Sequence, residues 1–379
     1  MGLTSQRKIR GFTLLELIVA MAIGLVVLGA AVSLFSQALR ASFLVTQRAE
    51  MQQNGRAALD MIAKDITLAG AGIPSGGVQL PDGAGVGNSL FGCDTQRCYI
   101  ANDNYPLNNH LFGVIPNHQT GQSVLTTSGN LGPQTDVLTV AYTDGTFPLN
   151  FYQVGMNANG TSVTFQLPNP APNPLPSPWP PPPVNDLAVG LKVGDLVLFS
   201  NNLGQAVGEV TNVTAAGPIA TVSFAANDVL NFNQPAATGG NLAAITNGGG
   251  ANLPTTTANR LLVITYYVDT PAGPDGIRYT ADDGPPRLMR QINGQTPTPV
   301  AENVVGLQAT YDIFDDVSGV STAGLPDAGM SQGKSPNQIR KVNVVVSARS
   351  PLQGTVGYQS LDLATSVSAR DMSFKDRYN

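Results

Sequence analysis

The chain has 379 residues, 42% of them apolar, which is enough for one or two domains with hydrophobic cores. This composition excludes a disordered protein and a miniature disulfide-stapled scaffold. Charged residues make up only 12%, about half of the usual share, while 41 Gly and 28 Pro indicate turn-rich β structure. The net charge of -5 gives no reason to expect binding to a polyanion, so we expect no nucleic-acid partner.

An apolar segment near the N-terminus is long enough to span a membrane. It covers residues 17–39, 23 residues without an ionisable side chain, and as a helix it would be about 34 Å long. Three basic residues precede it, and such residues stay on the cytoplasmic side: Arg7, Lys8 and Arg10. We therefore expect a cytoplasmic N-terminus and everything after Arg40 on the far side. A cleaved secretory signal peptide fits poorly, because its apolar core needs only about 7–15 residues.

Glu16 places a carboxylate directly before this apolar run. An ionised carboxylate in hydrocarbon costs several kcal/mol unless it has a partner, so Glu16 is a candidate functional residue. The alternative is a side chain that lies at the level of the lipid headgroups.

Residues 10–17, with the sequence RGFTLLEL, stand between the basic leader and the apolar helix. This arrangement resembles the class III signal of type IV prepilins and pseudopilins. The resemblance implies cleavage after Gly11 by a prepilin peptidase, N-methylation of the new terminal Phe12, and retention of the helix. Glycine offers no side chain to obstruct a protease, and cleavage frees a cationic α-amine at Phe12. In the family, the glutamate at the position of Glu16 is thought to meet this amine on the next subunit, which sets the register of the helices.

Beyond Arg40 the helical pattern becomes amphipathic. We expect one helix from Thr13 to about Ala69, about 85 Å long, because Gly70, Gly72 and Pro74 then stop it. One arc is apolar and needs a globular domain to bury it: Leu44, Met51, Ala58, Ile62, Ile66 and Ala69. The opposite arc is polar and is expected in solvent: Glu50, Gln53, Arg56, Asp60 and Lys64.

The rest of the chain is expected to be β-rich, with no second long helix. Nine segments have the pattern of strands: 136–142, 162–167, 195–200, 206–213, 219–224, 260–268, 287–292, 307–313 and 339–348. Residues 168–183 contain 10 of the prolines and predict an extended segment without sheet pairing. A spacer or strap is favoured there over a ligand for a partner's aromatic groove.

Four further stretches resemble PilW-type minor pilins: 194–199, 206–211, 300–308 and 342–350. The resemblance implies a type IV pilin-like α+β fold, in which a long transmembrane helix packs on a β-rich globular head. The expected parts are a cleaved leader, a transmembrane and filament-core helix, its amphipathic continuation and the head: 1–11, 12–39, 40–72 and 73–379. Whether the head is one domain or carries an inserted β module at about 184–224 stays open.

Two groups of residues suggest cross-links or ligands in the head. Cys93 and Cys98 lie beyond the membrane, where a disulfide forms readily, and free thiols are the alternative. Four aspartates crowd a glycine-containing loop and could supply oxygen ligands to calcium, the one possible cofactor: Asp269, Asp275, Asp282 and Asp283. A solvated acidic turn between two strands is the alternative.

Enzyme motifs are incomplete. Residues 329–335 are similar to a phosphate loop, but the spacing is one residue short and Pro336 follows where a helix should begin. No G-x-S-x-G sequence is present, and two histidines give no convincing catalytic constellation. We therefore expect no enzyme activity and no small-molecule substrate.

The resemblance implies a structural minor pilin that assembles through its helix into a type IV pilus, in an initiating or tip complex. Such complexes support adhesion, motility or DNA uptake. The implied partners are other pilins, the prepilin peptidase and the inner-membrane assembly platform. The implied location is the bacterial inner membrane and then the pilus at the cell surface. The alternatives are a minor pseudopilin of type II secretion and a pilus-borne adhesin.

Overall fold

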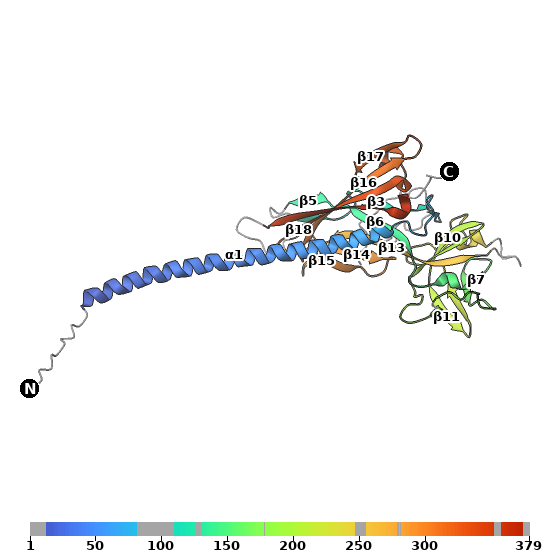
Figure 1. Ribbon diagram of the computed structural model, residues 1–379, viewed down its shortest axis with the longest axis horizontal. Helices are drawn as coiled ribbons and strands as arrows, with labels where there is room; N and C mark the ends of the chain where they lie inside the picture. Colours follow the sequence, from blue (N-terminus) through green and yellow to red (C-terminus); the bar gives the residue numbers. More distant parts are fainter. Residues whose placement is uncertain are drawn as a thin grey trace, which may run out of the picture. The chain divides into compact units, whose positions relative to one another are not determined.

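The computed structural model describes residues 13–81, 110–125, 130–177, 179–246, 255–278, 280, 282–351 and 358–373. The chain divides into two compact units, residues 1–52 and 53–379. One long N-terminal helix, α1, is followed by a β-rich part that we call the head (Figure 1). The expected α+β fold class is confirmed.

Helix α1 runs from Leu14 to Leu68, 55 residues in all, and differs from the expected helix by one residue at each end. It ends where Gly70 adopts a φ of 86°, a left-handed conformation that favours glycine. The amide of Gly70 then donates to Ala141 O at 2.9 Å instead of continuing the helix. In the described part of the head, the other α-helix is the four-residue α2, Arg370–Ser373.

The described strands form three larger sheets and two two-stranded sheets, all antiparallel. The seven-stranded sheet contains β10 (Gly204–Glu209), β9 (Leu196–Asn201), β13 (Thr257–Asp269), β14 (Arg287–Ile292) and β15 (Thr298–Glu302), with β6 (Val137–Asp144) on β13 and β3 (Val114–Asn117) on β6. A four-stranded sheet has the order β17 (Val320–Leu325), β16 (Val304–Asp315), β18 (Ile339–Arg349) and β19 (Ser360–Ser368). A second has the order β11 (Asn212–Ala216), β12 (Ile219–Ser223), β8 (Ser162–Gln166) and β7 (Gln153–Met156). The pairs are β1 (Val78–Gln79) with β2 (His110–Leu111), and β4 (Ser123–Leu125) with β5 (Leu131–Gln134).

Each of the nine expected segments contains a strand. The segment 287–292 matches β14 at both ends, whereas 206–213 covers β10 and the start of β11. Nine other described strands were not expected: β1, β2, β3, β4, β5, β7, β15, β17 and β19. Seven of them have five residues or fewer, too short for a clear pattern, and β17 is exposed over most of its length. The sequence analysis missed β19 although its burial alternates.

The polar residues expected on the outer face of α1 are exposed, and Ala58, Ile62, Ile66 and Ala69 are fully buried. They belong to a core cluster with side chains of β6 and β13 from one sheet and of β16 and β18 from another. Gly55 lies within the continuous helix, where a Cβ would stand 2.5 Å from the Leu363 side chain. Its role is therefore close packing against β19 rather than a bend.

The segment 184–224 contributes to two sheets. Its first strands, β9 and β10, pair into the seven-stranded sheet, while β11 and β12 join β7 and β8, which precede the proline-rich segment. Within 168–183 the described residues form no strand, and Tyr152 donates to Pro182 O at 2.7 Å. The proline-rich segment therefore connects β8 to β9 without sheet pairing of its own, as expected.

Candidate functional site

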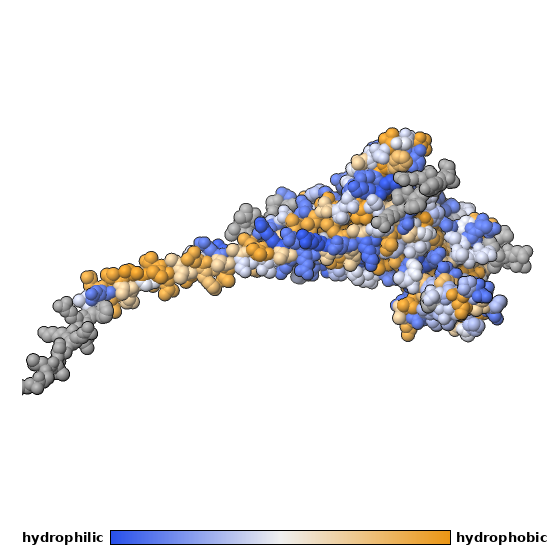
Figure 2. Space-filling model, viewed as in Figure 1, coloured by the Kyte–Doolittle hydropathy of each residue, from blue (hydrophilic) through white to orange (hydrophobic). Residues whose placement is uncertain are grey.

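The N-terminal part of α1 exposes apolar side chains around its circumference. Figure 2 shows the apolar side chains on one face of this part. The large exposed ones are Leu14, Leu15, Leu17, Ile18, Val19, Met21, Ile23, Leu25, Val26, Val27, Leu28, Val32, Leu34, Phe35, Leu39, Phe43, Leu44 and Val45. This helix is long and apolar enough to cross a membrane. A surface of this kind is stable only in lipid or against other apolar surfaces.

Glu16 closes the first turn of α1 through Thr13. The backbone N and the Oγ1 of Thr13 each donate to Glu16 Oε2 at 3.0 Å. In return, the backbone N of Glu16 donates to Thr13 Oγ1 at 3.3 Å. This is a capping box, in which a threonine and a glutamate three residues later satisfy the first free amides of the helix. The T-x-x-E spacing could have predicted this capping box, which was not among the expectations for Glu16.

Gly11 and Phe12, the expected cleavage and methylation positions, lie outside the described residues. Cys93 and Cys98 do as well. The processing site and the disulfide both stay predictions.

The C-terminal part of α1 is bound to the head through Asp65, a residue that the sequence analysis missed. Its side chain is 5% exposed. Tyr142 donates to Asp65 Oδ1 at 2.9 Å, and Tyr266 donates to Oδ2 at 2.5 Å. Arg290 donates to the same Oδ2 from Nε at 3.0 Å and lies 3.0 Å from it through Nη2. One carboxylate of the helix is thus bound by residues of β6, β13 and β14.

The electrostatics of this cluster keep both tyrosines neutral. Burial raises the pKa of Tyr266, and the Asp65 charge raises it further. The same causes raise the pKa of Tyr142. Although burial lowers it, the pKa of Arg290 is raised overall by its attraction to Asp65. Breaking such a pair is costly because it leaves a buried charge without its partner, so the cluster fixes the rotation of the helix against the sheet. The sequence signal for this cluster was the position of Asp65, an acidic residue directly before Ile66 of the apolar stripe.

The four aspartates considered for calcium do not share one site. Asp269 is bound by Arg278 at 2.7 Å and lies 3.5 Å from Arg287. Asp275 accepts from the backbone of Ile277, and Asp282 and Asp283 accept from Thr280. The arginines neutralise Asp269. The other three aspartates make the hydrogen bonds of a turn, not a ligand shell around a metal ion. Among the described residues, no group of three or more acidic, histidine or cysteine side chains could hold a metal ion.

Comparison with known proteins gives one match. A model of the prokaryotic N-terminal methylation motif matches residues 6–32, which include the basic leader, the Gly11–Phe12 junction, Glu16 and the first part of α1. No curated protein and no solved structure matches the chain. The motif supports a structural protein of the type IV pilin or pseudopilin kind that is made as a prepilin and assembles with other pilins.

Proposed function

We propose that this chain is a minor pilin of the PilW kind, which assembles through α1 into the initiating or tip complex of a type IV pilus. The observation that carries this function is the coincidence of two features in one segment. The methylation motif covers residues 6–32, and α1 exposes apolar side chains on all sides over the same region. A helix that is only a membrane anchor needs the exposed apolar side chains but not the methylation motif.

The order of events follows from the positions of these features. Prepilin peptidase removes residues 1–11, and Phe12 becomes the methylated N-terminus. Helix α1 then holds the chain in the inner membrane, with the head outside the cytoplasm. The assembly platform transfers the helix from lipid to the apolar core of the filament, so its exposed side chains exchange one apolar surrounding for another.

Glu16 supplies the register for this transfer. Among the described residues, both hydrogen bonds that its carboxylate accepts are on Oε2, and both come from Thr13 in the capping box. We propose that the carboxylate also binds the α-amine of Phe12 on a neighbouring subunit. In a core without water, either charge alone is strongly unfavourable, so helices that misalign the pair are rejected.

A substitution of Glu16 tests this function directly. A strain in which the gene for this chain is deleted expresses the Glu16→Gln variant instead. The amount of the variant is then measured in sheared filaments and in membranes. We expect the filament fraction to fall by about tenfold or more, because the amine would lose its charged partner. Glu50→Gln is the matched control, since Glu50 is an exposed glutamate on the same helix. Equal incorporation of the wild type and Glu16→Gln would contradict the proposed role.

Two alternatives share the same N-terminal segment. A minor pseudopilin would be needed for type II secretion, so loss of the chain would stop secretion and leave surface filaments intact. An adhesin head would be needed for attachment, so a chain without its head would still give filaments that fail to attach. Loss of the filaments themselves in that variant supports the initiating role. A Cys93–Cys98 disulfide in the head is a further proposal, which mass analysis before and after reduction can test.

A further inference from the structure

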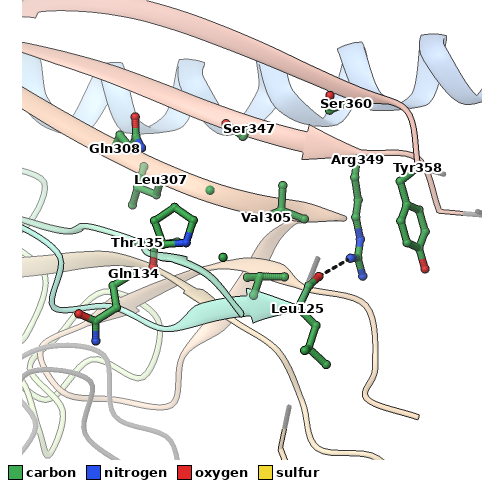
Figure 3. A pocket seen from close by; sticks show the side chains of 14 residues that line it. Leu125, Gln134, Thr135, Val305, Leu307, Gln308, Ser347, Arg349, Tyr358 and Ser360 are labelled. Carbon is green, nitrogen blue, oxygen red and sulfur yellow. Dashed lines mark hydrogen bonds between the residues drawn. The ribbon is translucent and has the colours of Figure 1, made fainter. Parts of the chain in front are cut away.

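The head contains a pocket that the pilin function does not use. It has a volume of about 340 Å³ and lies between the β4–β5 pair on one side and strands β16 and β18 on the other (Figure 3). Val305 and Leu307 of β16 and Leu125 of β4 form apolar walls. A pocket of this volume and lining is the size of a small organic ligand.

Arg349 stands at one end of the pocket, beside Tyr358 (Figure 3). Its Nη1 donates to Leu125 O at 3.2 Å, and its Cζ lies 4.4 Å from the centre of the Tyr358 ring. These two contacts fix the plane of the guanidinium. Its Nε is buried and has no hydrogen-bond partner. The Nε atoms of other arginines of the head, such as Arg287, are buried in the same way, so the case for a ligand depends on the rest of the guanidinium and on its charge.

Arg349 forms no ion pair with an acidic side chain in the described part of the chain. Five other arginines of the head are paired with aspartates: Arg260, Arg278, Arg287, Arg290 and Arg340. None of the described residues that line the pocket is acidic. The segments 126–129 and 352–357, which adjoin Leu125 and Tyr358 in sequence, contain no aspartate or glutamate.

We propose that this pocket binds a carboxylate carried on a short apolar body, with the carboxylate on Nη2 of Arg349 and the body against Val305, Leu307 and Tyr358. The Nη1 of Arg349 donates to Leu125 O and its Nε is buried, so Nη2 is the nitrogen left for a ligand. A hydrogen bond from this charged donor to a carboxylate is stronger than one between neutral groups. One cation among mostly apolar walls suits a single negative charge better than a doubly charged phosphate, which requires more donors.

Two sources supply this chemistry: a free organic acid, or the C-terminal carboxylate of a peptide with an apolar last residue. The site itself does not depend on pilus assembly, because all its residues belong to the head. Binding can therefore succeed or fail independently of the proposed function.

The test uses the full processed chain in detergent, with calorimetry and ligand-observed NMR. The probes are phenylacetate and its neutral analogue phenylacetamide, which share the ring and differ in charge. We expect phenylacetamide to bind about tenfold or more weakly, and Arg349→Gln to lower the affinity for phenylacetate by a similar factor. Arg340→Gln is the matched control, because Arg340 is on the same strand and outside the pocket, and we expect no change.

A second variant protects the test against misfolding of Arg349→Gln. Ser347→Met leaves Arg349 in place but fills part of the pocket, and we expect it to weaken phenylacetate binding as well. Equal affinities for phenylacetate and phenylacetamide, no binding of either, or wild-type affinity in both pocket variants would overturn the site. The tripeptide Gly-Val-Phe and its C-terminal amide distinguish the sources: tighter binding of the free-acid peptide than of phenylacetate assigns a peptide C-terminus, and weaker binding assigns a free organic acid.

Discussion

The two parts of helix α1 follow the same backbone geometry but meet opposite surroundings. Up to about Val45 its apolar side chains are exposed on every side, whereas from Ala58 to Ala69 one stripe is fully buried by the head. A helix that is apolar on all sides must be covered by lipid or by other chains. An amphipathic helix can bury its apolar stripe against the rest of its own chain.

The two carboxylates in these parts show the same contrast. Asp65 is bound by two tyrosines and an arginine of the head. Among the described residues, Glu16 is bound by Thr13 of its own first turn. Asp65 is therefore satisfied within the chain and has a structural role, while Glu16 retains capacity for a cation from a neighbour.

The largest effect is expected at Asp65. Asp65→Ala leaves the partly buried Arg290 without its anion, and we expect it to lower the free energy of unfolding of the head by about 3–5 kcal/mol. Asp60→Ala, on the exposed face of the same helix, should change it by less than about 0.5 kcal/mol. Urea unfolding of the full chain in detergent, followed by near-UV circular dichroism, measures both. Similar values for the two variants would remove the basis for the Asp65 cluster.

A smaller effect is expected from the apolar stripe. Ile62→Ala leaves a cavity in the core, and we expect a loss of about 2–4 kcal/mol in the same unfolding measurement. Leu25→Ala truncates a side chain of the exposed part, and the free energy of unfolding of the head should not change. If Leu25→Ala destabilised the head as much as Ile62→Ala, the contrast between the two parts of α1 would be wrong.

Glu209 extends the comparison to a buried carboxylate without a cation. Burial raises the pKa of Glu209 to about 7, and the nearby Asp228 adds to the shift. The folded chain therefore keeps a proton that the unfolded chain releases above its ordinary pKa of 4.5. Stability from this group should fall by about 1–3 kcal/mol as the pH rises from about 4.5 to about 7.

The measurement compares the free energy of unfolding at several pH values for the wild type and Glu209→Gln. Because glutamine does not titrate, the variant should lack this part of the pH dependence. Identical slopes in the two proteins would show that Glu209 titrates alike in the folded and unfolded states.

The smallest effect is expected at Thr13. Thr13→Ala removes the side chain that caps α1, at a cost of about 1 kcal/mol to the first turn. Hydrogen exchange should become faster for the amides of the first turn and stay unchanged in the head. Thr46→Ala is the control, since the hydroxyl of Thr46 bonds to Ser42 O within the helix and caps nothing. Equal exchange of the first turn in the wild type and Thr13→Ala would contradict the capping box.

Local patterns in the sequence were sufficient for α1 and for strands with strong apolar alternation, because helix stops and strand boundaries depend on neighbouring residues. The pairing of β13 with β6 and β9 was not predictable, since it joins segments far apart in the chain. The same reason hid the Asp65 cluster, in which Asp65 and Arg290 are 225 positions apart. Arg349 gave no signal, because the absence of an acidic partner appears only when the surrounding strands are in place.

The central claim is that α1 is kept in the mature protein and assembles, and the N-terminus tests it most directly. The measurement is the intact mass and N-terminal sequence of the chain recovered from sheared surface filaments and, separately, from membranes. We expect a chain that begins at methylated Phe12 in both fractions. A chain that retains Met1, or that begins after the apolar helix, would contradict the pilin function.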